Sequence, residues 1–156
     1  MEVCEKLLND DPESINVRGA QQRTPLHRAV GKGHNHIVNL LIEKKADFSI
    51  VDGGGLTALH WAALFGLVDT GRLLVRAHPE CINSQTKSGE TPLHLSAEKG
   101  NTEFVLFLME SKANIEVKDM GANGGQTAYD AAKAAGHKEC MQLLKPVGAN
   151  ACCVMS

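Results

Sequence analysis

The sequence has few aromatic residues and no large excess of charge of either sign. Aromatic side chains make up 4% of its 156 residues, although 43% of the residues are hydrophobic. A core of aliphatic side chains and alanine is therefore expected, within one domain at this length. The formal net charge is only −2. Because nucleic-acid binding depends on clustered Lys and Arg that neutralise phosphates, the composition argues against a nucleic-acid-binding protein.

Long apolar runs and an even set of cysteines are also missing. No apolar run approaches the roughly 20 residues that a helix needs to span a bilayer. Acidic residues interrupt the N-terminus where a secretory signal would be apolar. They are Glu2, Glu5, Asp10 and Asp11. The odd total of five cysteines argues against a disulfide framework. These absences predict a cytoplasmic protein, with Cys4 and Cys140 as small buried hydrophobic residues.

Sequence motifs of catalysis are absent as well. No Gly-rich phosphate loop follows an apolar strand, and no nucleophile elbow is present. His34 and His36 are two positions apart, whereas helical residues share a face at three or four positions, so they do not predict a zinc site. The sequence therefore predicts a protein that is not an enzyme and that holds no metal or cofactor.

What the sequence does contain is a motif that recurs four times. It reads Thr-Ala-Leu-His-Trp-Ala-Ala at residues 57–63 and returns at residues 24–30, at residues 91–97 and, more loosely, at residues 127–132. Successive copies are 33, 34 and 36 residues apart, as the threonine positions 24, 57, 91 and 127 show. A period of this length is typical of a helical solenoid.

Each copy of the motif carries the signals of a short helix. The threonine precedes an apolar run, where its hydroxyl can cap a helix, and Pro25 and Pro92 suit the first helical position. A glycine nine residues after each threonine can end the helix in a left-handed conformation. These glycines are Gly33, Gly66, Gly100 and Gly136. A second apolar helix follows each one, and a mid-helix Gly71 predicts that the helix of the second copy is the softest.

The repeated motif and its period resemble those of the ankyrin-repeat family. The resemblance implies an all-α fold, an ankyrin-repeat solenoid of stacked helix pairs with hairpin-like loops. It also implies that the motif histidines hydrogen-bond the motif threonines and the loop backbone instead of binding metal. These histidines are His27, His60 and His94. In the last copy Asp130 replaces histidine, as expected of a terminal repeat with a more polar outer face.

The repeats divide the chain into three parts. Residues 1–15 are expected to be a half repeat that has the second helix only, because residues 11–16 match residues 78–83. Residues 16–145 hold four ankyrin repeats, and residues 146–156 form a flexible tail. The half repeat is either a natural N-terminal cap or the sign that this chain is the C-terminal part of a longer protein.

In the ankyrin-repeat family the loop tips and the first helices form a concave surface for a protein partner. By this resemblance the partner-binding residues are expected at the loop tips, just before the motif threonines and just before the glycines. Apolar residues of the second repeat are flanked there by charge, as in an interaction hot spot. Trp61 either belongs to this surface or fills the core between repeats. The predicted residues are Arg23, Lys32, Leu56, Trp61, Leu64, Phe65, Lys87, Glu90, Glu98 and Lys99.

The last four residues, Cys153-Val154-Met155-Ser156, match a prenylation box whose final serine favours farnesyl. One prenyl chain binds membranes only reversibly, and Cys152 is a candidate for palmitoylation. The leading hypothesis is a monomeric, non-catalytic adaptor that holds an unknown protein partner at a cytosolic membrane face and touches the membrane through lipid only. The alternatives are a soluble inhibitor or assembly factor without lipid and a fragment of a larger ankyrin-repeat protein.

Overall fold

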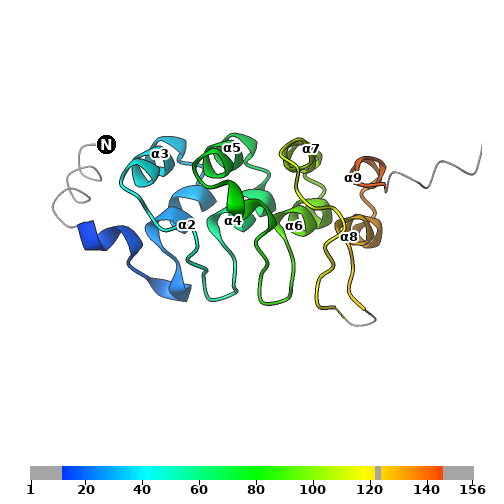
Figure 1. The fold of residues 1–156 in the computed structure, drawn as a ribbon, viewed down its shortest axis with the longest axis horizontal. Helices are drawn as coiled ribbons and strands as arrows, with labels where there is room; N and C mark the ends of the chain where they lie inside the picture. The colour runs from blue at the N-terminus through cyan, green and yellow to red at the C-terminus, as the bar shows by residue number, and fades with distance from the viewer. Residues whose placement is uncertain (1–11, 122–123, 146–156) are drawn as a thin grey trace, which may run out of the picture.

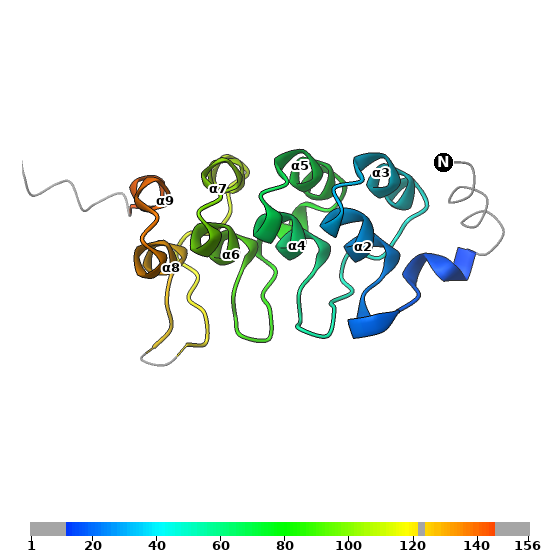
Figure 2. The same ribbon diagram turned by 180° about the vertical axis from the view of Figure 1, so that it is seen from behind.

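The computed structural model describes residues 12–121 and 124–145. Within these ranges it contains eight α-helices, three short 3-10 helices and no strand. Figure 1 shows the helices in two rows, with long loops that extend to one side. Figure 2 shows the same two rows from behind. The expected all-α solenoid of stacked helix pairs is confirmed.

Each pair consists of an inner helix next to the loops and an outer helix behind it. The inner helices are α2 (Pro25–Gly31), α4 (Ala58–Phe65), α6 (Pro92–Lys99) and α8 (Ala128–Ala135). The outer helices are α3 (Asn35–Glu43), α5 (Val68–Ala77), α7 (Thr102–Glu110) and α9 (Lys138–Leu143). None of the helices in the described residues is long and apolar enough to span a bilayer.

The inner helices begin and end where the sequence predicts. All four start with a capping box, in which the threonine accepts from the third helical N–H and that third residue accepts from the threonine N–H. The partners are Thr24 with His27, Thr57 with His60, Thr91 with His94 and Thr127 with Asp130. The predicted glycines have φ between 65° and 81°, so each one adopts the left-handed conformation that ends the turn.

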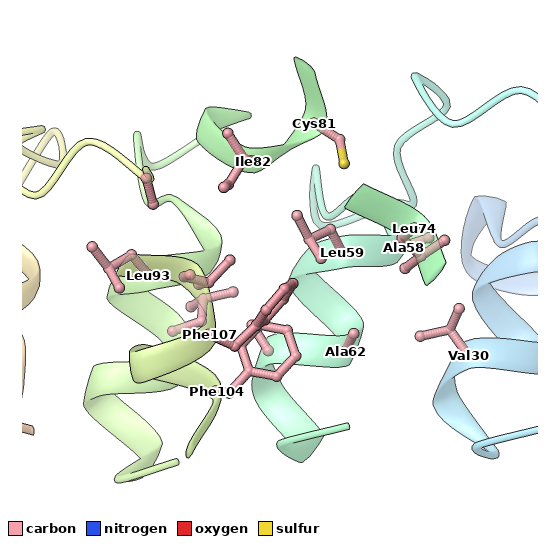
Figure 3. Close-up of a cluster of buried hydrophobic side chains, with 14 of the residues drawn as sticks. Val30, Ala58, Leu59, Ala62, Leu74, Cys81, Ile82, Leu93, Phe104 and Phe107 are labelled. Atoms are coloured by element: carbon pink, nitrogen blue, oxygen red, sulfur yellow. The ribbon is translucent and has the colours of Figure 1, made fainter. Parts of the chain in front are cut away.

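The core lies between the two rows and is mostly aliphatic, as the composition predicts. Leu26, Leu59 and Leu93 are each 1% exposed. Two aromatic rings, Phe104 and Phe107 of α7, meet edge to face with centroids 5.5 Å apart and point toward the second helix pair in Figure 3. Cys81 and Cys140 are buried free thiols, as expected for Cys140, whereas Cys4 lies outside the described residues.

The space beside Gly71 in α5, where a side chain would lie, is filled by two aromatic rings of α7. A Cβ atom on Gly71 would lie 2.8 Å from Phe104 and 3.0 Å from Phe107, which is closer than packed carbon atoms approach. The absence of a side chain at Gly71 therefore lets α7 pack against α5. That α5 is the softest helix stays a prediction.

Two equivalent 3-10 helices support the proposed match between residues 11–16 and residues 78–83. They are η1 (Pro12–Asn16) and η3 (Pro79–Asn83). The Asn16 side chain accepts from the Asp47 backbone N–H at 2.9 Å, and Asn83 accepts from Asn114 at 2.9 Å. The expected half-repeat helix at residues 3–8 lies outside the described residues, and the division at residues 15 and 145 stays a prediction.

The loops are hairpin-like turns with one backbone hydrogen bond at the base. These bonds run from Gly19 to Arg23, Asp52 to Leu56, Thr86 to Glu90 and Asp119 to Gln126, at 2.9–3.0 Å. The last pair is farther apart along the chain than the others, so this loop is the longest, as predicted. Its residues 122–123 lie outside the described residues, and its predicted mobility stays a prediction.

Candidate partner-binding surface

Four equivalent positions in each pair, three of which share one face of the inner helix by their spacing, define what we call the inner face; one of these residues, Leu95, is buried. The four positions are the residue before the motif threonine and the fourth, seventh and eighth residues after it. In chain order they are Arg23, Arg28, Gly31 and Lys32; Leu56, Trp61, Leu64 and Phe65; Glu90, Leu95, Glu98 and Lys99; and Gln126, Ala131, Ala134 and Ala135. Nine of the ten predicted partner-binding residues are among them, and the tenth, Lys87, is exposed at a loop tip.

Trp61 is the centre of a cluster on this face. The Arg23 guanidinium lies over its ring, 4.2 Å from the centroid, and the Phe65 ring centroid is 5.8 Å away. The indole N–H donates to a carboxylate oxygen of Asp52 at 3.0 Å. A Cβ atom on Gly31 would lie 3.1 Å from the indole. Trp61 is half-buried, so it both fills space between pairs and contributes to the surface.

The Arg23 side chain is held in place from two sides. Its Nε lies 4.0 Å from the Asp52 carboxylate and is buried without a hydrogen-bond partner. The Trp61 ring covers the guanidinium, a cation–π contact that is stronger where water is excluded. Arg23 therefore presents a positive charge in a fixed position beside the indole.

Phe65 is the apolar side chain of this cluster that is open to solvent. It is 54% exposed, whereas Leu56 and Leu64 are half-buried and pack against the core. Among the large hydrophobic side chains exposed in the described residues, Phe65 alone belongs to an inner helix; the others are Val17, Leu106 and Met120. The second pair thus exposes an aromatic surface, as predicted for Phe65.

Charge is unevenly distributed along the inner face. The first pair has three basic residues at inner-face positions, Arg23, Arg28 and Lys32. Arg28 and Lys32 are exposed. Between α6 and α8 there is instead a cavity of about 330 Å³ whose lining includes Glu90, Glu98 and Asp119. Its remaining lining residues are His94, Gln126, Ala131, Ala134 and Ala135.

Arg28, Asp119 and the three alanines were not predicted as surface residues. The spacing from the motif threonine could have indicated Arg28 and the alanines, since they occupy the positions of Trp61, Leu64 and Phe65 in other copies. Asp119 lies in the one loop whose length departs from the period, so the spacing rule does not identify it.

The motif histidines use both ring nitrogens for structure, as the resemblance implies. Nδ1 accepts from the threonine at 3.2 Å. Nε2 therefore carries the proton and donates to a carbonyl of the next loop, at 2.9–3.1 Å. Burial lowers the pKa of His27, and lowers that of His60 to about 4. His27 and His60 are therefore neutral at neutral pH, with both ring nitrogens hydrogen-bonded.

Reactive groups are likewise scarce among the described side chains. Burial raises the pKa of the Cys81 thiol to about 11, so it remains protonated and a poor nucleophile. No group of three His, Cys, Asp or Glu side chains in the described residues is arranged to hold a metal ion. Cys152 and Cys153, the predicted lipidation sites, lie outside this part of the chain.

Stacked helix pairs that each open with a threonine capping box, joined by hairpin-like loops, define a repeat protein with an extended binding surface. A family model for ankyrin repeats (3 copies) matches residues 1–86 and 72–154. The chain belongs to the ankyrin-repeat family. Members of this family generally bind protein partners and are generally non-catalytic.

Relatives of the chain come from plants and animals. Human ankyrin repeat domain-containing protein 63 is 34% identical over 86% of this chain and 36% of its own length. The nuclear factor NF-kappa-B p105 subunit of Gallus gallus is 29% identical over 96% of this chain and 15% of its own. The probable E3 ubiquitin-protein ligase XBOS33 of Oryza sativa subsp. japonica is 29% identical over 81% of this chain and 32% of its own. The chain thus spans about a third or less of the length of these relatives.

Proposed function

We propose that this protein is a non-catalytic adaptor that binds a partner protein on its inner face, with Trp61 and Phe65 at the centre of the contact. The observation that carries the proposal is the exposure of Phe65, 54%, beside an indole that Asp52 and Arg23 hold in place. Trp, Tyr and Arg side chains at the centre of a polar rim often contribute most of the binding energy in protein interfaces, and Trp61 and Arg23 supply two of these residue types here.

The surroundings of Trp61 favour binding because they order the surface in advance. The indole has its hydrogen bond and its packing contact before a partner arrives. A partner that covers the rings then loses less conformational freedom than one that must order them. The loop at Gly53 is also held by the next loop, because the Gly53 carbonyl accepts a hydrogen bond from Lys87 Nζ at 3.1 Å. The proposal also includes that the protein acts as a monomer.

Replacement of Phe65 by alanine is the sharpest test. Phe65→Ala removes an exposed ring and is expected to weaken the complex by about 2 kcal/mol or more, with little change in thermal stability. Leu106→Ala is the matched control, since Leu106 is 45% exposed on the outer helix α7. A partner captured from the native cell with the wild-type protein would be purified and its Kd measured by calorimetry for each variant.

Equal Kd values for wild type, Phe65→Ala and Leu106→Ala would contradict the proposed centre of the interface. Trp61→Ala is a weaker test, because it also removes the hydrogen bond to Asp52 and the packing on Gly31. It is expected to lower the melting temperature as well as the affinity.

A lipid anchor at Cys153 is a second part of the proposal, and it depends on Ser156 being the native C-terminus. The four residues from Cys153 to Ser156 support it, because they match a farnesylation box. Intact mass of protein from its native cell is expected to show the loss of the last three residues, a farnesyl group and a methylated terminus. Native protein that retains Ser156 without added lipid mass would leave a soluble binding protein as the better description. Residues before Met1, in the same spectrum, would show a longer protein.

Variants of the two adjacent cysteines separate the two lipid signals. Cys153→Ser is expected to abolish membrane association. Cys152→Ser is expected to leave a farnesylated protein that exchanges among internal membranes, since one chain binds only marginally. Fractionation and microscopy measure both. Identical membrane fractions for wild type and Cys153→Ser would exclude the anchor.

A further inference from the structure

Three neighbouring helix pairs present different chemistry at the same inner-face positions. The first pair presents Arg28 and Lys32, the second Trp61 and Phe65, and the third Glu90 beside the Glu98–Lys99 ion pair. Because the pairs are stacked in one row (Figure 1), these groups form a basic, then aromatic, then acidic order along the face. The order arises because pairs with different side chains are stacked next to one another.

The basic end has more positive charge than its surroundings neutralise. Arg28 and Lys32 are exposed, and neither forms an ion pair in the part of the chain that the structure describes. Arg23 has Asp52 nearby, but that carboxylate already accepts from the Trp61 indole and from two backbone N–H groups. Acidic groups of a partner would therefore meet free cations here.

The acidic end is a cavity with an apolar wall. Three carboxylates and no Lys or Arg are among its lining residues in the described part of the chain, and three alanines of α8 supply small apolar surface. Lys99 pairs with Glu98 at 2.9 Å, which leaves Glu90 and Asp119 without an ion pair among the described residues. Backbone N–H groups of Gln126 and Gly121 lower the pKa of Asp119, so it remains ionised. A Lys or Arg side chain suits such a site, because its stem packs on apolar groups while its head reaches carboxylates.

We propose that the occupant of the inner face is an extended segment of the partner protein that carries acidic, then apolar or aromatic, then basic side chains in the order that the face requires. The acidic residues lie on Arg28 and Lys32, the apolar ones on Trp61 and Phe65, and a Lys or Arg enters the cavity between α6 and α8. This inference rests on the proposed function and specifies the chemistry of the partner.

The size of the surface fits a short segment. Packed helices lie about 8–10 Å apart, so α2 and the cavity between α6 and α8 are separated by roughly 20–25 Å. About seven extended residues cover that span at about 3.3 Å each. A segment of this length needs no folded structure of its own, and its charged ends fix its register on the row.

The experiment uses a phage-displayed library of random peptides of roughly ten residues, selected against the full chain. Wild type is expected to enrich peptides with Asp or Glu toward one end, Lys or Arg toward the other, and apolar residues between. The variant Arg28→Glu with Lys32→Glu is expected to lose the acidic preference only, and Glu90→Lys the basic preference only. Each change weakens a peptide selected on wild type about tenfold, and less at high salt.

Matched charge changes on the outer helices control for net charge. Arg76→Glu in α5 with Lys138→Glu in α9, and Glu43→Lys in α3, change exposed residues and are expected to leave the selected sequences and their affinities unchanged. Enrichment of peptides with like charge at both ends, preferences that the inner-face variants do not alter, or failure to enrich any peptide would overturn this inference.

Phe65→Ala in the same selection separates the two proposals. Selected peptides that lose affinity with Phe65→Ala but show no charge order would support the proposed function and reject the segment. Charge-ordered peptides that bind Phe65→Ala as tightly as wild type would contradict the aromatic centre, and with it the apolar middle of the segment.

Discussion

The second and fourth helix pairs solve the same capping problem with different side chains. His60 and Asp130 both occupy the third position of their helix and both bond the threonine that opens it. His60 has a second nitrogen, which donates to the Glu90 carbonyl of the next loop at 3.1 Å, whereas the hydrogen bonds of the Asp130 side chain stay within its own capping box. His60 is completely buried and Asp130 is exposed. Histidine therefore caps its own helix and joins two pairs, and aspartate only caps.

The outer helices of these two pairs differ in a similar way. Gly71 in α5 and Met141 in α9 are both fourteen residues after their motif threonines. Met141 packs against the core with its own side chain, while the space beside Gly71 is filled by Phe104 and Phe107 of the next pair. Both helices of the second pair thus make these contacts with the next pair. In the fourth pair the equivalent side chains, Asp130 and Met141, cap the helix and pack against the core.

Loss of the His60 imidazole, which contacts Thr57 and the Glu90 carbonyl, is expected to have the largest effect on stability. His60→Ala removes the imidazole bonds to Thr57 and to the Glu90 carbonyl and leaves a cavity at a completely buried position, so it should cost about 3 kcal/mol of unfolding free energy. Asp130→Ala, at an exposed site, should cost about 1 kcal/mol or less. Urea denaturation of both variants measures the difference. Equal losses would show that the bond to the next loop contributes nothing.

Acidification should distinguish His60 from Asp130, because their contributions to the stability of the fold are lost in different pH windows. The folded pKa of His60 is about 4, against an ordinary 6.5. The unfolded chain therefore takes up a proton first, and stability falls as pH drops from 6.5 toward 4, by about 2 kcal/mol at pH 5. His27, whose pKa is also lowered, adds to this loss.

The lowered pKa of Asp130, which results from its Thr127 hydrogen bonds, stabilises the fold above its ordinary value of 3.8, and this contribution disappears only at lower pH. Denaturation at pH 7 and pH 5 of wild type and His60→Gln checks the assignment. The variant is expected to show a smaller difference between the two pH values. An unchanged pH dependence would mean that another group titrates in this window.

A methyl group at Gly71 should give a smaller loss. Alanine favours a helix over glycine by about 1 kcal/mol, but here its Cβ would meet Phe104 at 2.8 Å, and overpacking costs about 1–3 kcal/mol. Gly71→Ala is therefore expected to destabilise by about 1 kcal/mol. The double variant with Phe107→Leu should lose less than the sum of the single changes. A stabilising Gly71→Ala would show that α7 moves aside without cost.

The features that the sequence predicted are those that repeat with the period. The threonine caps, the glycine ends of the inner helices and the burial of Leu59 and its equivalents follow from local chemistry and helical spacing. The function of Gly71 could not be derived in this way, because it depends on rings that are more than thirty residues away.

The candidate surface shows the same limit. Phe65 could be identified from its position, but the contact of Arg23 with Trp61 and the carboxylate cavity depend on how neighbouring pairs are placed against each other. The spacing of a repeat assigns a residue to a face. It does not determine which side chains from different repeats meet there.

The hydrogen bonds from His27, His60 and His94 also determine how the molecule opens. Each one joins a pair to the next loop along the chain, so cooperativity passes from neighbour to neighbour, as in a one-dimensional lattice. Weakening the contact at His60 would divide one melting unit into two. Amide hydrogens of α2 and α3 would then exchange with solvent while those of α6 and α7 remain protected. A change that a partner induces at the first pair would reach the cavity between α6 and α8 through this contact and through the packing of α6 and α7 on the second pair.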